Sequence, residues 1–261
     1  MERVRELIKK CREDGDSKAI FGEILELLKT EEGMFAVSAR ITNNFYMGTE
    51  NGKAAAFIYT SRDNADGFVK SMKWVGIETK SLEIHPAQRI AFFNDLYRSG
   101  FEAVVIDKEQ ESLSMSLFSI IEKPEPGTET VMNPSLMRAA SQFYQALVRH
   151  RAVEMMQDLM CAELYKGRYL APTSDPRKMT PPVLADNKGG KFYPVFTDWV
   201  EFGKFDRKRH FQTDTIRFRD FKNYMSGVDG IVVNPFGFGL KLDTEKLERI
   251  EKENLKLKVV K

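Results

Sequence analysis

The sequence predicts an α+β protein made of two tandem copies of a mixed sheet with flanking helices. The first observation is a phrase at residues 51–61, NGKAAAFIYTS, which returns in related form at 188–198 as KGGKFYPVFTD. The second is SGFEAVVID at 99–107, which returns at 226–234 as SGVDGIVVN. Because two phrases recur in the same order, chance explains them poorly, and we expect a duplicated domain with one copy in each half.

The first half is expected to alternate helices and strands. A three-to-four spacing of apolar residues over 20–28 predicts a helix that stops before Gly33, with a strand following at 34–41. Asn51 and Gly52 both tolerate the positive φ of a type I′ turn, so they predict a hairpin that joins 45–47 to a strand at 54–60. The remaining elements are expected as helices at 64–72 and 86–98 and strands at 80–84, 103–106 and 113–118.

A linker is expected at 122–132, between a first domain at 1–121 and a second at 133–261. Residues 122–129 contain two prolines and a glycine and no apolar anchor, which is typical of a linker. Asn133 and Pro134 have the form of an N-cap and a first helical residue, and they open a helical region to about residue 165. Its apolar stripe is interrupted at 149–151, where a break or a bend is expected.

The second half is expected to repeat the plan of the first. Asp198 predicts an N-cap for a helix at 199–205, and Thr244 does the same for the last helix. Strict alternation over 215–219 places Ile216 and Phe218 on the buried face of a strand. The other expected elements are a helical turn at 221–225 and strands at 168–172, 182–184, 191–196, 230–233 and 240–242.

Composition and charge favour an ordinary globular protein of the cytoplasm. The formal net charge is +2, from 40 basic and 38 acidic residues, which argues against a dedicated nucleic-acid binder. Two cysteines in 261 residues do not suggest a disulfide framework. The charged start, MERVR, differs from a signal peptide, and no apolar run approaches the roughly 20 residues of a membrane span.

The common catalytic motifs are missing from the sequence. It contains no phosphate-binding loop, dinucleotide-binding glycine motif, zinc-protease motif, paired Cys-x-x-Cys or nucleophile elbow. The three histidines, His85, His150 and His210, are widely separated. We therefore expect no catalytic residues, no cofactor and no metal, and oligomeric state stays open.

The densest candidate binding surface is aromatic and lies in the second half. An aromatic-lined groove with two polar anchors would use Tyr193, Phe196, Asp198, Trp199, Asn234 and Phe236. The simpler interpretation is that alternating aromatic residues form the core, that Asp198 caps a helix and that Asn234 belongs to a turn. Trp199 is expected to be partly exposed, because it would begin the first helical turn.

A second candidate surface is basic. It consists of Arg207, Lys208, Arg209, Arg217 and Arg219, which could meet an acidic partner or a phosphate backbone. Asp206, Asp214 and Asp220 are interleaved with these residues. The aspartates reduce the positive electrostatic potential of this surface, and a solvent-exposed face without a partner is the simpler interpretation.

Two motifs of the second half resemble a known family. GGKFYPVFTDW at 189–199 and DGIVVNPFG at 229–237 are similar to the N-terminal domain of the SseB, or enhanced serine sensitivity, proteins, over about 165–242. The resemblance implies an α+β domain of a bacterial cytoplasmic protein and implies no catalytic residues. The first half departs from the pattern, with AAA at 54–56 for KFY and DKEQ at 107–110 for NPFG, which suggests a diverged copy.

These observations lead us to expect a non-enzymatic protein of SseB-like type that binds a protein partner or a small ligand through its second domain. Two alternatives stay open. An enzyme with an unrecognised site would be favoured by a strongly perturbed acid or base in a concave pocket of the second domain. A nucleic-acid-associated module would be favoured by a continuous basic stripe that joins Lys208 and Arg209 to Arg217 and Arg219.

Overall fold

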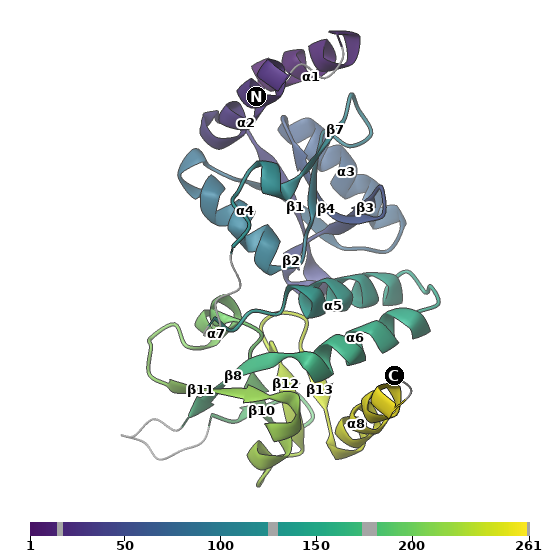
Figure 1. The fold of residues 1–261 in the computed structure, drawn as a ribbon, viewed down its shortest axis with the longest axis vertical. Helices are drawn as coiled ribbons and strands as arrows, with labels where there is room; N and C mark the ends of the chain where they lie inside the picture. Colours follow the sequence, from purple (N-terminus) through teal and green to yellow (C-terminus); the bar gives the residue numbers. More distant parts are fainter. Residues whose placement is uncertain (15–17, 125–129, 174–181, 260–261) are drawn as a thin grey trace. The chain divides into compact units, whose positions relative to one another are not determined.

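The computed structural model describes residues 1–14, 18–124, 130–173 and 182–259. The chain divides into two compact units. Unit 1 contains Met1–Pro126 and Gln145–Arg151, and unit 2 contains Gly127–Tyr144 and Ala152–Lys261. Helices and mixed sheets occur in both units, so the α+β class is confirmed (Figure 1). Within the expected linker, residues 125–129 lie outside the described residues.

A mixed sheet forms the centre of unit 1. Strands β4 and β6 are parallel neighbours, whereas β1 pairs antiparallel with β5, β3 with β4, and β6 with β7. The turn between β3 and β4 holds Asn51 and Gly52 at positive φ, as the Asn-Gly pair predicts. The strands are β1 (Phe35–Ala39), β2 (Asn44–Phe45), β3 (Met47–Glu50), β4 (Lys53–Tyr59), β5 (Thr79–Glu83), β6 (Ala103–Ile106) and β7 (Leu113–Ser116).

Helices cover both faces of this sheet. Because successive residues of a strand point to opposite sides, β4 contributes to two cores. Ile58 packs with residues of α1 (Glu2–Asp14), α2 (Lys18–Thr30) and α4 (Arg89–Arg98), and Phe57 packs with Phe68 of α3 (Arg62–Trp74). Helix α1 was not among the expected helices. It buries Val4, Leu7, Ile8 and Cys11, which fall at helical spacing.

The described residues of unit 2 form two small sheets, which a bridge between Leu170 and Phe196 joins. The first sheet has the order β13-β12-β10-β9, and the second pairs β11 with β8. The strands are β8 (Arg168–Thr173), β9 (Leu184–Ala185), β10 (Lys191–Val195), β11 (Gln212–Arg217), β12 (Gly230–Val233) and β13 (Leu240–Leu242). The expected strand at 215–219 ends early, because Phe218 begins a 3-10 helix, η4 (Phe218–Tyr224). Ile216 and Phe218 are both buried, as the alternation predicts.

The long helical pattern after Asn133 is divided, as the interruption at 149–151 predicts. Helix α5 (Pro134–Leu147) ends before the interruption, and α6 (Glu154–Lys166) begins after it. His150 lies between them with a positive φ of 53°, a conformation that no α-helix continues. The last two helices are α7 (Trp199–Phe205) and α8 (Thr244–Val259).

The recurring phrases occupy similar local structures in the two units. Ala56 pairs with Val104 in the parallel pair β4–β6, and Tyr193 pairs with Ile231 in the parallel pair β10–β12. In the alignment of the phrases, Ala56 corresponds to Tyr193 and Val104 to Ile231. The registers of the two parallel pairs are therefore the same.

The residues that follow these strands also correspond. Asp107 and Asn234 both have a φ of 48°, and their side chains accept the backbone N–H of Thr60 and Thr197, each at 2.9 Å. In both units, the residue that follows the second strand of the parallel pair thus accepts a backbone N–H from the threonine that follows the first strand.

Asp186 opens the turn between β9 and β10. Its Oδ1 accepts the backbone N–H groups of Lys188 and Gly190 at 2.9 Å, and Lys241 Nζ lies 2.6 Å from its Oδ2. The hydrogen bond from Lys241, followed by the two backbone donors, lowers the pKa of Asp186 to about 2.

We expect an NMR titration to give the Asp186 carboxyl a pKa of about 2, below its usual 3.8. Because the folded pKa lies below the unfolded one, the stabilisation is present above the unfolded pKa and is lost as the pH falls towards about 2. Lys241→Gln should raise the pKa of Asp186. The control Lys246→Gln should leave it unchanged, since Lys246 pairs with Asp243. Equal values in the wild type and Lys241→Gln would contradict this assignment.

Candidate functional site: an aromatic corner in unit 2

The candidate site lies where β10 passes into α7. Phe196, Thr197 and Asp198 connect the two elements, and the turn that follows β12 packs beside them. Asp198 is the N-cap residue of α7, as the sequence predicts. Its Oδ1 accepts the backbone N–H groups of Val200 and Glu201 at 2.9 Å, which satisfies two of the first free donors of the helix.

Asn234 ties the turn to the corner. Its side chain is fully buried, its Oδ1 accepts the N–H of Thr197 at 2.9 Å, and its Nδ2 donates to Thr197 Oγ1 at 2.8 Å. Thr197 Oγ1 in turn donates to Asp198 Oδ2 at 2.7 Å. The two expected polar anchors, Asp198 and Asn234, are therefore close together, and these hydrogen bonds hold the corner in shape.

Two of the candidate aromatic residues are core residues. Phe196 is fully buried, and its ring centroid lies 5.4 Å from that of Phe202 and 5.3 Å from that of Phe205. Tyr193 is buried, and its hydroxyl donates to the carbonyl of Pro172. Burial raises the pKa of Tyr193, so its hydroxyl stays protonated and remains a donor.

Two other candidates and one neighbour are exposed. Trp199 is 53% exposed, Val200 49% and Phe236 45%. The ring centroid of Trp199 lies 5.7 Å from that of Phe202, and the ring centroid of Phe205 lies 6.4 Å from that of Phe236. We call the five residues Trp199, Val200, Phe202, Phe205 and Phe236 the aromatic corner.

Glu201 of α7 and Gly237 of the turn meet on the inner side of the corner, and sequence reasoning missed Glu201. Glu201 is 1% exposed and forms an ion pair with Lys204 at 2.6 Å. A Cβ on Gly237 would lie 2.8 Å from a carboxylate oxygen of Glu201, so any larger residue there would displace the end of that side chain. The Glu-Lys spacing of three residues on a helix is the signal that could have indicated the ion pair.

The five basic candidates form two separate groups. Arg207, Lys208 and Arg209 are exposed on a turn that Asp206 closes by accepting the N–H groups of His210 and Phe211, at 2.8 and 2.9 Å. Arg217 is the last residue of the six-residue strand β11, and Arg219 follows it in η4. The strand separates them from the first group by roughly 17 Å, at about 3.3 Å per residue.

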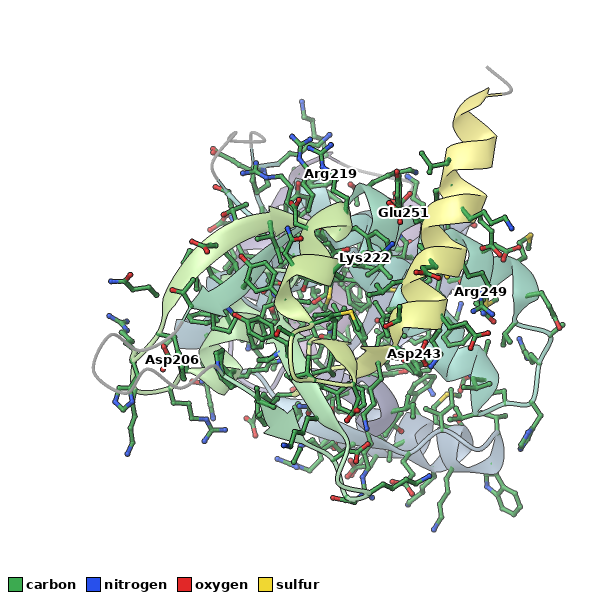
Figure 2. All side chains as sticks on the ribbon, turned by 90° about the horizontal axis from the view of Figure 1, so that it is seen from below. Asp206, Arg219, Lys222, Asp243, Arg249 and Glu251 are labelled. Atoms are coloured by element: carbon green, nitrogen blue, oxygen red, sulfur yellow. The ribbon has the colours of Figure 1, made fainter. Side chains whose placement is uncertain are left out.

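Figure 2 shows Asp206 and Arg219 well apart in unit 2. The exposed carboxylate of Asp214 lies on the strand between the two groups. Next to the second group, Lys222 of η4 pairs with Glu251 of α8 at 3.0 Å. The five expected basic residues therefore do not form one continuous basic surface.

A group of three potential metal ligands occurs among the described residues of unit 1. Single ligand atoms of Glu32, Glu83 and His85 lie within 4.8 Å of one another. Glu83 already pairs with Arg62 at 3.1 Å. A cation at this place would compete with that ion pair.

The geometry of unit 2 defines a small α+β domain whose strand-to-helix corner carries exposed aromatic residues. Residues 143–249, which include this corner, match the family model of the SseB protein N-terminal domain. The resemblance inferred from the sequence motifs is thereby confirmed for this part of the chain.

Two further comparisons add no functional information. No curated protein matches the chain. Among solved structures, Tic22 from Plasmodium falciparum is similar at 12% identity over 89% of this chain and 98% of that chain, with a TM-score of 0.20. A score this low supports no argument about fold or function. None of the described helices is long and apolar enough to span a membrane.

Proposed function

We propose that the chain is a non-enzymatic, bacterial, cytoplasmic protein of SseB-like type, and that unit 2 binds a protein partner through the aromatic corner. The observation that carries this proposal is the exposure of Trp199, Val200 and Phe236, each about half exposed on a corner that buried hydrogen bonds hold in shape. Large apolar side chains gathered on a rigid surface are typical of interaction sites.

The partner that fits this surface has an apolar anchor beside acidic residues. Helix α7 ends at Phe205, and the exposed Arg207, Lys208 and Arg209 follow directly. Complementary charges at the edge of an apolar contact favour one orientation of a partner. A small ligand is less well supported, because the polar groups of Asp198 and Asn234 already bond within the corner.

The perturbed titratable groups described in unit 2 do not favour the alternative of an enzyme, because Asp186 belongs to a turn whose donors account for its low pKa. Burial raises the pKa of Tyr144, Tyr169 and Tyr193, which keeps these hydroxyls protonated. The alternative of a nucleic-acid-associated module is weakened by the separation of the basic residues, because few phosphates could be neutralised together.

We also propose that the two units descend from one duplicated domain, with the boundaries 1–121 and 133–261 and a linker at 122–132. The equal registers of β4–β6 and β10–β12 support this proposal. Ser61 and Asp198 are N-caps at corresponding positions, which supports it further. The first copy lacks the counterpart of Trp199 and Phe236, since Arg62 and Glu109 stand at those places in the aligned phrases.

The test of binding uses Trp199→Ala and Phe236→Ala. We expect proteins captured from the native cell by the wild type to be lost with both variants, and the purified partner to bind each of them at least tenfold more weakly. The melting temperature should change little, because both side chains are half exposed. The control is Trp74→Ala, since Trp74 is 91% exposed in unit 1.

A single-tryptophan form reports the contact directly. The chain has two tryptophans, so Trp74→Phe leaves Trp199 as the one indole. Its emission should shift to the blue when the partner covers the corner. Undiminished binding by Trp199→Ala, or a salt-sensitive submicromolar affinity for DNA or RNA in place of a protein partner, would contradict the proposal.

A further inference from the structure

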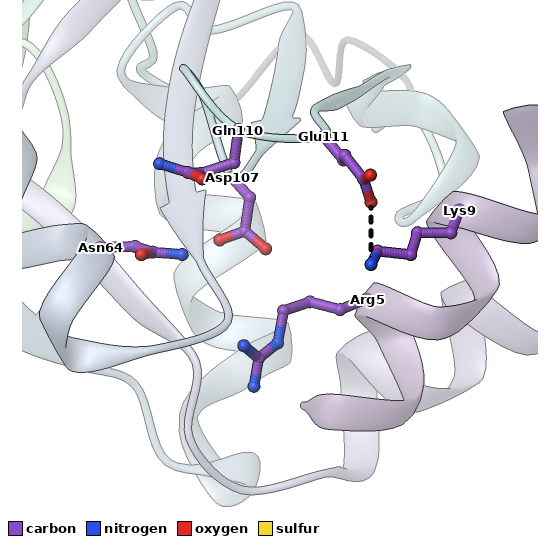
Figure 3. Close-up of a pocket in the computed structure, with 6 residues that line it drawn as sticks. All are labelled: Arg5, Lys9, Asn64, Asp107, Gln110 and Glu111. Atoms are coloured by element: carbon purple, nitrogen blue, oxygen red, sulfur yellow. Dashed lines mark ion pairs between the residues drawn. The ribbon is translucent and has the colours of Figure 1, made fainter.

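A pocket of about 360 Å³ opens in unit 1 at the carboxyl ends of the parallel strands β4 and β6 (Figure 3). Asp107 follows β6 directly, and Asn64 lies in the first turn of α3, which follows β4. Ligands of open sheets with parallel strands bind in the crevice at this edge. The pocket is lined by Arg5, Lys9, Asn64, Asp107, Gln110 and Glu111.

The basic and the acidic side chains of the pocket come from two different segments of the chain. Both cations, Arg5 and Lys9, come from α1, where a spacing of four residues places them on one face. Both carboxylates, Asp107 and Glu111, come from the segment between β6 and β7. Figure 3 shows the α1 side chains facing this segment, and Lys9 Nζ lies 3.8 Å from Glu111 Oε2.

The side chain of Asp107 is held in place by hydrogen bonds at the edge of the pocket. Its side chain is 2% exposed, and its two oxygens accept the N–H and the hydroxyl of Thr60, at 2.9 and 2.5 Å. Its backbone has a φ of 48°, which residues other than glycine adopt uncommonly. A buried carboxylate is costly unless a cation or further donors complement it, and the side-chain hydrogen bonds of Asp107 among the described residues come from two neutral donors of Thr60.

We propose that this pocket binds a small zwitterion that carries an amino group and a carboxylate, such as a free amino acid. The ammonium group lies against Asp107 and Glu111, and the carboxylate lies against Arg5 and Lys9. A simple anion would face two carboxylates, and a simple cation would face two basic side chains. A ligand with both charges meets the opposite sign at each end.

The rest of the pocket suits a polar ligand of this size. The amide groups of Asn64 and Gln110 line the pocket and supply both donors and acceptors. The volume lies within the range of roughly 300 to 1,000 Å³ for small-molecule sites. This proposal is independent of the aromatic corner, because every lining residue belongs to unit 1.

The experiment titrates the full chain with each of the twenty standard L-amino acids by calorimetry and by NMR. We expect saturable binding of at least one of them, with shifted resonances of Asn64 and Gln110. For the tightest ligand, two analogues are then compared, one without the amino group and one without the carboxylate. Each analogue should bind at least tenfold more weakly.

Three variants locate the site. Arg5→Gln should weaken binding at least tenfold, and the exposed Lys10→Gln on the same helix should not. Asp107→Asn should also weaken binding at least tenfold while the protein stays folded, because Asn234 makes the corresponding contacts to Thr197 in unit 2. Folding of each variant is checked by its melting temperature.

Several outcomes would overturn the proposal. One is the absence of saturation by any amino acid at 10 mM, a concentration that corresponds to about 2.7 kcal/mol of binding free energy. Another is equal affinity for the analogue without an amino group, which would indicate a site for anions. A third is unchanged affinity in Arg5→Gln and Asp107→Asn, which would place the ligand elsewhere.

Discussion

Arg89→Met is expected to lower the free energy of unfolding by at least about 3 kcal/mol. The Arg89 side chain is fully buried in unit 1, and its guanidinium donates to three backbone carbonyls: those of Ile84 and Leu28 at 2.6 Å, and that of Glu31 at 2.7 Å. Methionine fills much of the same space but donates to none of them. Each buried carbonyl left without a donor costs about 1 to 3 kcal/mol.

Burial also acts on the arginine itself, and it lowers the pKa of Arg89. Removing a desolvated charge offsets part of the loss, so the expected cost is near the lower end of the sum over three carbonyls. The side chain connects the end of α2 to the segment between β5 and α4. The loss should therefore appear as unfolding of unit 1 as a whole.

The matched control for this change is Arg62→Met. Arg62 is exposed, and it pairs with Glu83 at 3.1 Å. Exposed ion pairs contribute about 0 to 1 kcal/mol, so this variant should unfold within about 1 kcal/mol of the wild type. Urea denaturation of both variants measures the difference. If Arg89→Met is as stable as Arg62→Met, the three hydrogen bonds of Arg89 do not hold unit 1 together.

Phe196→Ala is expected to cost about 3 to 5 kcal/mol, the usual range for a buried phenylalanine. The ring is fully buried and packs against Phe202 and Phe205. Its backbone exchanges two hydrogen bonds of 2.9 Å with Leu170, which form the bridge between the two sheets in the described part of unit 2. A cavity at this place removes packing where the two sheets meet.

The comparison with Trp199→Ala separates core from binding surface. Trp199 is 53% exposed and lies three residues further along the chain, so its truncation should cost no more than about 1 kcal/mol. Thermal and urea denaturation of the two variants provide the measurement. If Trp199→Ala unfolds as readily as Phe196→Ala, the aromatic corner is core, and the proposed binding surface is wrong.

Local sequence signals were sufficient for the elements that depend on neighbouring residues. The Asn51-Gly52 turn, the Asp198 N-cap and the strands at 103–106 and 230–233 are found where the sequence predicts them. The turn and the cap depend on contacts within a few residues, and the two strands are marked by short apolar runs although their partners β4 and β10 are distant in the sequence. Helix α1 was missed, although Val4, Leu7, Ile8 and Cys11 carry its apolar spacing, because charged residues dominate the segment.

The sequence motifs also determined the family to which the second half is similar, since residues 143–249 match the SseB protein N-terminal domain. The position of Trp199 in the first helical turn predicted that it is partly exposed, and it is 53% exposed, but the motifs did not show which of the other aromatic residues are core. Phe196 and Trp199 are both aromatic residues of one short segment, yet the first is fully buried and the second is half exposed. The first turn of α7 accounts for the exposure of Trp199, whereas the burial of Phe196 depends on its packing against Phe202 and Phe205.

Tertiary structure alone brought distant residues together. Asn234 meets Thr197 across 37 positions, and Arg5 lines the same pocket as Asp107, about 100 positions away in the sequence. It also separated residues that look adjacent, since Arg209 lies in the turn before strand β11 and Arg217 is the last residue of that strand. The sequence by itself determined the elements, because turns, caps and alternation are short-range. Only the packing of helices on sheets decided the sites, because charge and shape at a surface depend on which strands become neighbours.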